Sequence, residues 1–135
     1  MKNRGFTLIE LLAVILILSL LTTLAVTSVT KMVRNSKEKL YTTQIKSIEV
    51  AAENWAADHL ASLPEAGSCI YITVDDLQKY GVLDNDIKDP RTNKLIPTTT
   101  TVRIDATGGG NSLTSYTYKV TDDISDCAVV TLEQP

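Results

Sequence analysis

The sequence contains neither glycine nor proline between Phe6 and Leu63. These are the two residues that interrupt helices most strongly, because glycine loses the most backbone entropy and proline lacks an N–H group. Beyond residue 40, apolar side chains also recur at helical spacings of three and four, and together these features predict one helix over residues 6–61. The stripe consists of Tyr41, Ile45, Ile48, Ala52, Trp55 and His59.

Residues suited to catalysis are also scarce. The single histidine, His59, falls on the apolar stripe and is therefore expected to be a half-buried packing residue. No serine or cysteine has a partner that would activate it as a nucleophile. The run Gly108–Gly110 lacks the lysine and the helix start of a phosphate-binding loop and is better explained as a hairpin turn. We therefore expect no enzyme activity and no catalytic residue.

Charge is almost absent from residues 6–29, where Glu10 is the one ionisable side chain in 24 residues. This length exceeds the roughly 20 residues that span a hydrocarbon core. An ionised carboxylate placed toward the middle of a bilayer costs roughly 2.5 to 3.5 kcal/mol, so an acid in such a helix usually has a function and a partner. Lys2 and Arg4 precede the apolar run and favour a cytoplasmic amino end. A second basic group follows the run and weakens that charge asymmetry: Lys31, Arg34, Lys37 and Lys39.

Hydroxyl-bearing and β-branched residues are concentrated over residues 22–30. Such residues form helices poorly, because branching restricts their rotamers and hydroxyl groups compete for backbone hydrogen bonds. The segment therefore predicts either a soft hinge or a continuous straight helix.

A secretory signal peptide and a plain membrane anchor are simpler interpretations of the amino-terminal segment. Its basic start fits a signal peptide, but the apolar run is too long, contains Glu10 and ends near Ala25 without a clear A-x-A site. No cysteine follows the run, which excludes a lipoprotein anchor. A plain anchor has no use for the acid.

The residues Gly5-Phe6-Thr7-Leu8-Ile9-Glu10 resemble the processing and methylation motif of type IV pilins and their pseudopilin relatives. The resemblance implies that a prepilin peptidase cuts after Gly5 and methylates the new amine of Phe6. It also implies that Glu10 is the buried acid of that family. The cationic Phe6 amine of one subunit could then neutralise Glu10 of its neighbour, although desolvation offsets much of the gain.

This resemblance implies a structural subunit of an extracellular type IV filament, polymerised as a helical homopolymer through its N-terminal helix. The implied partners are the prepilin peptidase, an inner-membrane assembly platform, minor pilins and, before assembly, the cell membrane. The precursor would cross the membrane once, with its amino terminus in the cytoplasm, and reach the cell surface after assembly. A pseudopilin of type II secretion or of competence DNA uptake is the alternative within the family. A membrane-anchored binding domain that never polymerises is the alternative outside it.

From Ser62 onward the composition predicts a small sheet. Strands are expected at 69–74 and 128–132, and a hairpin is expected to pair 101–106 with 115–120. A short helix is expected at 75–80, capped by Thr73 and ended by Gly81. A loop is expected at 83–97. Alternation directs one set of side chains toward the helix stripe: Val102, Ile104, Tyr116, Tyr118 and Val120.

The predicted fold class is therefore α+β and pilin-like, with a long N-terminal transmembrane and amphipathic helix packed on a small antiparallel sheet. Four parts are expected along the chain. They are a leader peptide at 1–5, a transmembrane and filament-core helix at 6–30, an amphipathic helix at 31–61 and a globular head at 62–135.

Two cysteines, Cys69 and Cys127, allow one intramolecular disulfide. A head of about 74 residues is small for a stable hydrophobic core, and an exported location favours oxidation. The family resemblance adds that many pilins fasten their C-terminal region with one disulfide. Two buried free thiols are the alternative.

The head is acidic, with six basic and 11 acidic side chains from Leu63 onward, which disfavours strong nucleic-acid binding. Two loops carry oxygen ligands of the kind calcium prefers, but neither has the glycine and terminal glutamate of an EF-hand. We expect exposed turn residues there, with no metal and no cofactor. The loop residues are Asp84, Asn85, Asp86 and Asp89 in one, and Asp122, Asp123 and Asp126 in the other.

Overall fold

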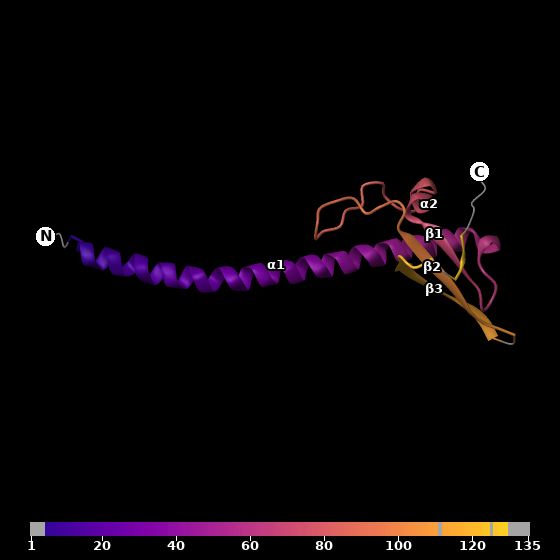
Figure 1. Ribbon diagram of the computed structural model, residues 1–135, viewed down its shortest axis with the longest axis horizontal. Coiled ribbons are helices and arrows are strands. Elements are labelled where there is room, and N and C mark those ends of the chain that lie inside the picture. Colours follow the sequence, from indigo (N-terminus) through magenta and orange to yellow (C-terminus); the bar gives the residue numbers. More distant parts are fainter. Residues whose placement is uncertain (1–4, 111, 125, 130–135) are drawn as a thin grey trace. The chain divides into compact units, whose positions relative to one another are not determined.

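The computed structural model describes residues 5–110, 112–124 and 126–129. Figure 1 shows the elements in chain order. The chain divides into two compact units, Met1–Glu38 and Lys39–Pro135, and the second unit is called the head below. The elements are α1 (Leu8–Asp58), the 3-10 turn η1 (Leu60–Ser62), β1 (Cys69–Thr73), α2 (Val74–Lys79), β2 (Thr101–Gly109), β3 (Ser112–Thr121) and β4 (Ala128–Val129).

In the first unit, α1 is an apolar helix whose hydroxyl groups are satisfied by its own backbone. The hydroxyl of Ser19 donates to the carbonyl of Leu16 at 2.8 Å, and that of Thr23 donates to Leu20 at 2.7 Å. Each such bond satisfies a polar group that would otherwise be stranded in an apolar surround. Helix α1 is unbroken across residues 22–30. Of the two alternatives for that segment, the structure has the continuous helix.

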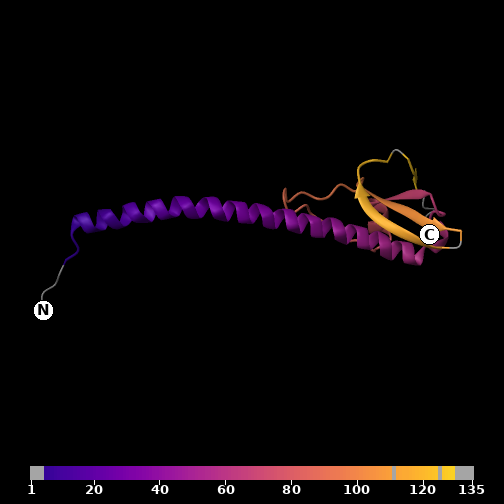
Figure 2. The same cartoon turned by 90° about the horizontal axis from the view of Figure 1, so that it is seen from below.

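The core of the head forms where the last turns of α1 pack on the sheet. Ile48, Ala52 and Trp55 are each 0% exposed, and the strands contribute buried apolar side chains opposite them. Figure 2 shows β2 and β3 running alongside the end of α1. This arrangement confirms the α+β class and the apolar stripe that the sequence predicts. The buried residues from the strands are Ile70, Ile72, Val102 and Ile104.

The sheet has the strand order β3-β2-β1-β4. The antiparallel register places Ile70 beside Ile104 and Ile72 beside Val102, so the buried side chains form rows across the helix-facing side. On β3, Tyr116, Tyr118 and Val120 are half-buried while Thr117 and Lys119 between them are exposed. The predicted alternation of the hairpin is confirmed.

The prediction that the last strand completes an antiparallel sheet is wrong. Strand β4 runs parallel to β1, with Ala128 beside Ile70 and Val129 beside Tyr71. Cys69 is the first residue of β1 and Cys127 immediately precedes β4, so the disulfide joins the two strands where each begins, which is compatible with parallel pairing. The predicted strand extends over 128–132, and residues 130–132 lie outside the described residues.

Several element boundaries also differ from the prediction. Helix α1 ends at Asp58 rather than at residue 61, and η1 forms the next turn. Strand β1 ends at Thr73, because the Thr73 side chain accepts from the Asp76 backbone and the Asp76 carboxylate accepts from the Thr73 backbone. This reciprocal capping box begins α2 at Val74. Gly81 follows α2 with φ 71°, the left-handed conformation that glycine adopts most readily.

The packing of α1 predicts a large effect from a single truncation. Replacing Ile48 by alanine should lower the free energy of unfolding of the head by about 2–5 kcal/mol, because it leaves a cavity in a site with no exposure. Urea unfolding of the full-length chain in detergent, followed by Trp55 fluorescence, measures this. The matched control is Asn54→Ala on the exposed side of the same helix, which should change stability by about 0.5 kcal/mol or less. Equal effects from the two variants would contradict the packing described.

Candidate functional site

Helix α1 begins with a capping interaction that involves the predicted functional acid. The Glu10 backbone N–H donates to the Thr7 hydroxyl oxygen at 3.3 Å and to the Thr7 carbonyl at 3.1 Å. The Thr7 hydroxyl in turn donates to the Glu10 carboxylate at 3.5 Å. Thr7 therefore occupies the N-cap position, and Glu10 is the third helical residue, where an acid also interacts favourably with the helix dipole.

The residues before Thr7 are exposed and not helical. Gly5 and Phe6 lie outside α1, Phe6 is 74% exposed, and no atom lies within 4 Å of the place where a side chain on Gly5 would begin. The peptide bond between them is thus open to an approaching enzyme. The remaining leader residues, including Lys2 and Arg4, lie outside the described residues.

The apolar part of α1 is long and apolar enough to cross a membrane, and the segment that meets this criterion contains no buried residue. Leu8 is 83% exposed and Ile9 is 76% exposed, so Glu10 lies among side chains that favour lipid or another protein over water. Gly5, Phe6 and Glu10 lie within six consecutive residues. The structure therefore brings the predicted cleavage point and the acid together at the start of one helix.

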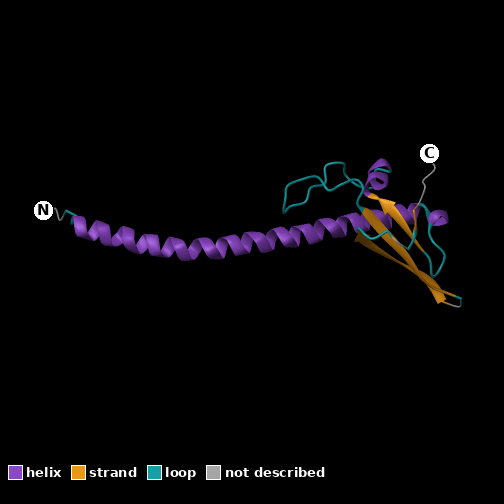
Figure 3. Cartoon of the chain, in the orientation of Figure 1, coloured by secondary structure: helices purple, strands orange, loops and turns teal. Residues whose placement is uncertain are grey.

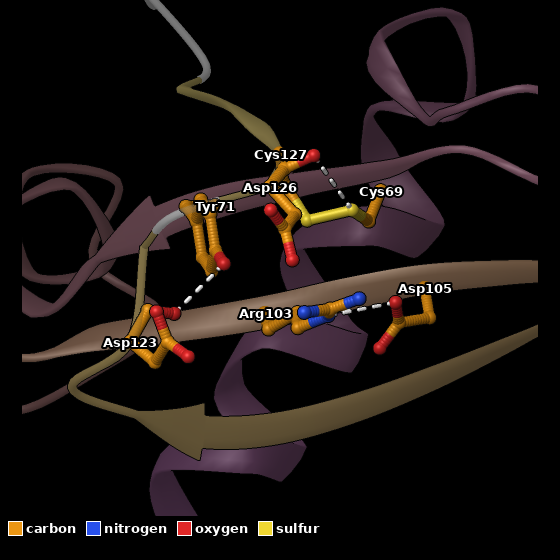
Figure 4. Close-up of a disulfide and its surroundings, with 7 residues drawn as sticks. All are labelled: Cys69, Tyr71, Arg103, Asp105, Asp123, Asp126 and Cys127. Atoms are coloured by element: carbon orange, nitrogen blue, oxygen red, sulfur yellow. Dashed lines mark hydrogen bonds and ion pairs between the residues drawn. A yellow bond between two sulfur atoms is a disulfide. The ribbon is translucent and has the colours of Figure 1, made fainter.

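A second cluster, shown in Figure 4, lies on the side of the sheet that faces away from α1. Cys69 and Cys127 are bonded to each other, with their Cα atoms 5.1 Å apart. The Tyr71 hydroxyl donates to the Asp123 carbonyl at 2.8 Å, and Tyr71 is 1% exposed beneath the segment that leads to Cys127. Beside it, the Arg103 guanidinium donates to the Asp105 carboxylate at 2.8 Å. The disulfide and the tyrosine together fasten residues 121–127, of which 125 is not described, onto the sheet.

The acidic loops do not converge on a metal site among the described residues. Asp89 instead binds Arg91, whose Nη2 lies 2.9 Å from Oδ2 of Asp89, and this hydrogen bond lowers the pKa of the Asp89 carboxyl. Cys69, Asp105 and Cys127 bring three potential ligand atoms within 4.8 Å of one another. Because the two sulfur atoms are joined as a disulfide, that group lacks the thiolates a metal would require.

Two interactions in the structure were not predicted from the sequence, the cap at Thr7 and the contact of Arg91 with Tyr41. The pattern Thr7-x-x-Glu10 is the signature of a capping box and could have identified Thr7 as the helix start. The contact of Arg91 over the Tyr41 ring, at 3.3 Å from the ring centre, had no such signal. His59 is half-buried as predicted, and its ring stacks on Trp55 with ring centres 4.8 Å apart.

Comparison with known families gives one match. Residues 1–26 match the family model described as the prokaryotic N-terminal methylation motif, which is the prepilin signature of type IV pilins and pseudopilins. No curated protein and no solved structure matches the chain. The match covers the helix start that contains Gly5, Phe6 and Glu10, and it supports a pilin-like or pseudopilin precursor.

The fastened C-terminal segment generates a stability prediction. Replacing Cys69 and Cys127 together by serine should lower the free energy of unfolding of the head by about 4 kcal/mol, because the bond closes a separation of 58 residues. Urea unfolding followed by Trp55 fluorescence measures the loss, and the exported amount should fall as well.

The matching control is the reductant itself, which should destabilise the wild-type head and leave the double-serine variant unchanged. Labelling of exported protein under denaturing, nonreducing conditions supplies an independent check. Two reactive thiols in that experiment would show that the bond does not form in the cell.

Proposed function

We propose that this pilin-like precursor is a structural subunit of an extracellular type IV filament. In the proposal, a prepilin peptidase cuts after Gly5 and methylates the amine of Phe6, and the processed chain polymerises with itself through α1. The observation that carries the proposal is the prepilin signature over residues 1–26, with Glu10 as the one ionisable side chain of an exposed apolar helix.

The chemistry of Glu10 suits an assembly role. A carboxylate and a free amine are each poor solutes in lipid, and they neutralise each other when they meet. Within one chain, the new Phe6 amine lies just before α1, and Glu10 lies in the first turn of α1. Between chains, the amine of one subunit meets the acid of its neighbour only in the assembled stack. Assembly therefore removes an energetic penalty that the isolated subunit retains in the membrane.

The proposal divides the chain into four parts. Residues 1–5 are the leader, 6–30 cross the membrane and later form the filament core, 31–61 carry the amphipathic helix, and 62–135 form the globular head. The amino terminus begins in the cytoplasm, and the head is carried to the cell surface. An assembly platform in the inner membrane and minor pilins complete the proposed machinery, and the acidic head is not expected to bind nucleic acid strongly.

Processing provides the first test. Mass spectrometry of the exported protein should find a mature chain that begins with N-methylated Phe6. Replacing Gly5 by valine should leave the precursor uncut, because the added side chain would block a peptidase site shaped for glycine. An exported chain that retains Met1, or one cut near Ala25, would remove this proposal.

Glu10 provides the second test. Glu10→Val should enter the membrane at least as well as the wild type, because an apolar side chain removes the cost of burying an acid. It should still be cut after Gly5, and its head should fold with the disulfide intact. The number of filaments on the cell should nevertheless fall at least about tenfold, as expected if the lost pairing is worth about 1.4 kcal/mol or more per subunit. Electron microscopy of sheared filaments counts them.

The capping interaction at Thr7 supplies a control that separates charge from helix geometry. Glu10→Gln removes the charge but keeps a side chain that suits the third position of a capping box. If charge is the requirement, Glu10→Gln and Glu10→Val should be equally defective. Normal filaments from Glu10→Gln alone would assign the acid to capping, and normal filaments from both variants would mean that Glu10 has no assembly role.

A further inference from the structure

The tip of the β2–β3 hairpin presents an isolated apolar side chain. Leu113 is 96% exposed, the highest exposure of any large apolar side chain that the structure describes. It lies within residues 107–117, a segment that contains no Asp, Glu, Lys, Arg or His. A leucine that is almost fully exposed to water on an uncharged tip is unusual, because burial of its side chain would be favourable.

The described residues next to Leu113 are closely packed. A side chain on Gly108 would begin 2.5 Å from the carbonyl oxygen of Leu113, so only glycine allows the two strands to approach this closely. The register shifts between Thr107 and Gly109, which marks a bulge. Below it, the backbone N–H of Gly67 donates to the Ala106 carbonyl at 2.8 Å and ties the hairpin to the segment that follows η1. Leu113 therefore lies next to a closely packed part of the hairpin.

The head also has a groove of about 570 Å³. Its apolar lining comes from Tyr41 and Ile45 of α1, Leu95 and Pro97 of the loop between α2 and β2, and Val120 of β3, and its charged lining from Asp89, Lys94 and Asp122. The loop is fixed by Arg91, which lies over the Tyr41 ring, and by the Ile96 N–H, which donates to the Ile87 carbonyl at 2.9 Å. Leu95 remains 59% exposed at the rim.

The hairpin tip and the groove lie at opposite ends of the head, as Figure 3 shows for the strands and the loop. Tyr41 lines the groove, whereas Gly109 of the hairpin lies beside Ala66, which follows the end of α1. The helix rise alone separates Tyr41 from Asp58 by about 25 Å. Leu113 therefore cannot fill the groove of its own chain.

We propose that the hairpin tip of one subunit inserts Leu113 into the groove of a second copy. The inference rests on the proposed function, since a polymer places many copies of both surfaces next to each other. An uncharged tip with an exposed leucine suits the apolar part of the groove lining, Tyr41, Ile45, Leu95, Pro97 and Val120, and every copy carries both surfaces. Because the two surfaces differ and lie at opposite ends, the contact is heterologous and can repeat without closing. The hairpin tip then adds a head-to-head contact to the one made by the helices.

Cross-linking of paired cysteines tests this contact directly. The double variant Leu113→Cys with Leu95→Cys is produced as the full-length chain in cells that supply the assembly machinery, and sheared filaments are treated with a short bismaleimide. The native cysteines are bonded to each other and do not react. The expected result is a ladder of covalent oligomers on a denaturing gel. The control pair is Thr117→Cys with Leu95→Cys, which keeps the groove thiol and moves the other along β3, and it should give no ladder.

Each other outcome overturns the inference. Equal ladders from the two pairs would indicate nonspecific proximity, dimers without higher oligomers would indicate a closed symmetric contact, and a link to a different protein would identify another occupant. If the wild type forms filaments but neither pair cross-links, this inference fails and the proposed function stands. If the wild type forms no polymer at all, both fail.

A second variant measures the strength of the contact. Leu113→Ser should leave the head folded, because the side chain is exposed, and should weaken the contact by roughly tenfold to a hundredfold, the range expected for one buried leucine. Filament length after a fixed shear reports the change. Leu60→Ser, at a leucine that is 71% exposed outside both surfaces, is the matched control and should leave the length unchanged. Equal shortening by both variants would contradict the inference.

Discussion

The head depends on one contact, the packing of Ile48, Ala52 and Trp55 of α1 against the sheet. The strands alone cannot exclude water from their helix-facing side, because a sheet of this size has a single apolar face and no second sheet to cover it. Burial of a large apolar side chain contributes about 1.5–3 kcal/mol, so Ile48 and Trp55 contribute a large part of the stability of the head. The other end of the same helix is long and apolar enough to cross a membrane. Along α1 the sequence changes from a uniformly apolar surface to a single apolar stripe.

At the other end of α1, the presence of an acid at Glu10 has two explanations, one local and one longer-range. The local one is the hydrogen bond between its backbone and Thr7, which starts the helix. Many acids at the third helical position do no more than this. The longer-range one is the pairing that we propose with the amine of a neighbouring subunit in a filament. The two roles are compatible, because the Thr7 hydroxyl contacts only Oε2 of the Glu10 carboxylate and the second carboxylate oxygen can accept from an amine.

Periodicity was the most informative feature of the sequence. Spacings of three and four predicted the helix stripe, and strict alternation predicted which side chains of β2 and β3 face it; both are present in the structure. The direction of β4 could not be predicted, because a strand of two residues has too little pattern to specify its neighbour. The cap at Thr7 was readable from the pattern Thr-x-x-Glu. The placement of Arg91 over Tyr41 was not, because it depends on the path of a loop whose sequence carries no period.

The bond between Cys69 and Cys127 also has a mechanical consequence. The two residues are 58 positions apart and enclose α2, β2 and β3, so a head pulled at one point against its helix cannot lengthen through that part of the chain. Fully extended, the enclosed segment would span on the order of 200 Å. Because the disulfide is covalent, this segment cannot extend under force even when the noncovalent core unfolds. Formation of the disulfide thus limits how far a subunit under tension can lengthen.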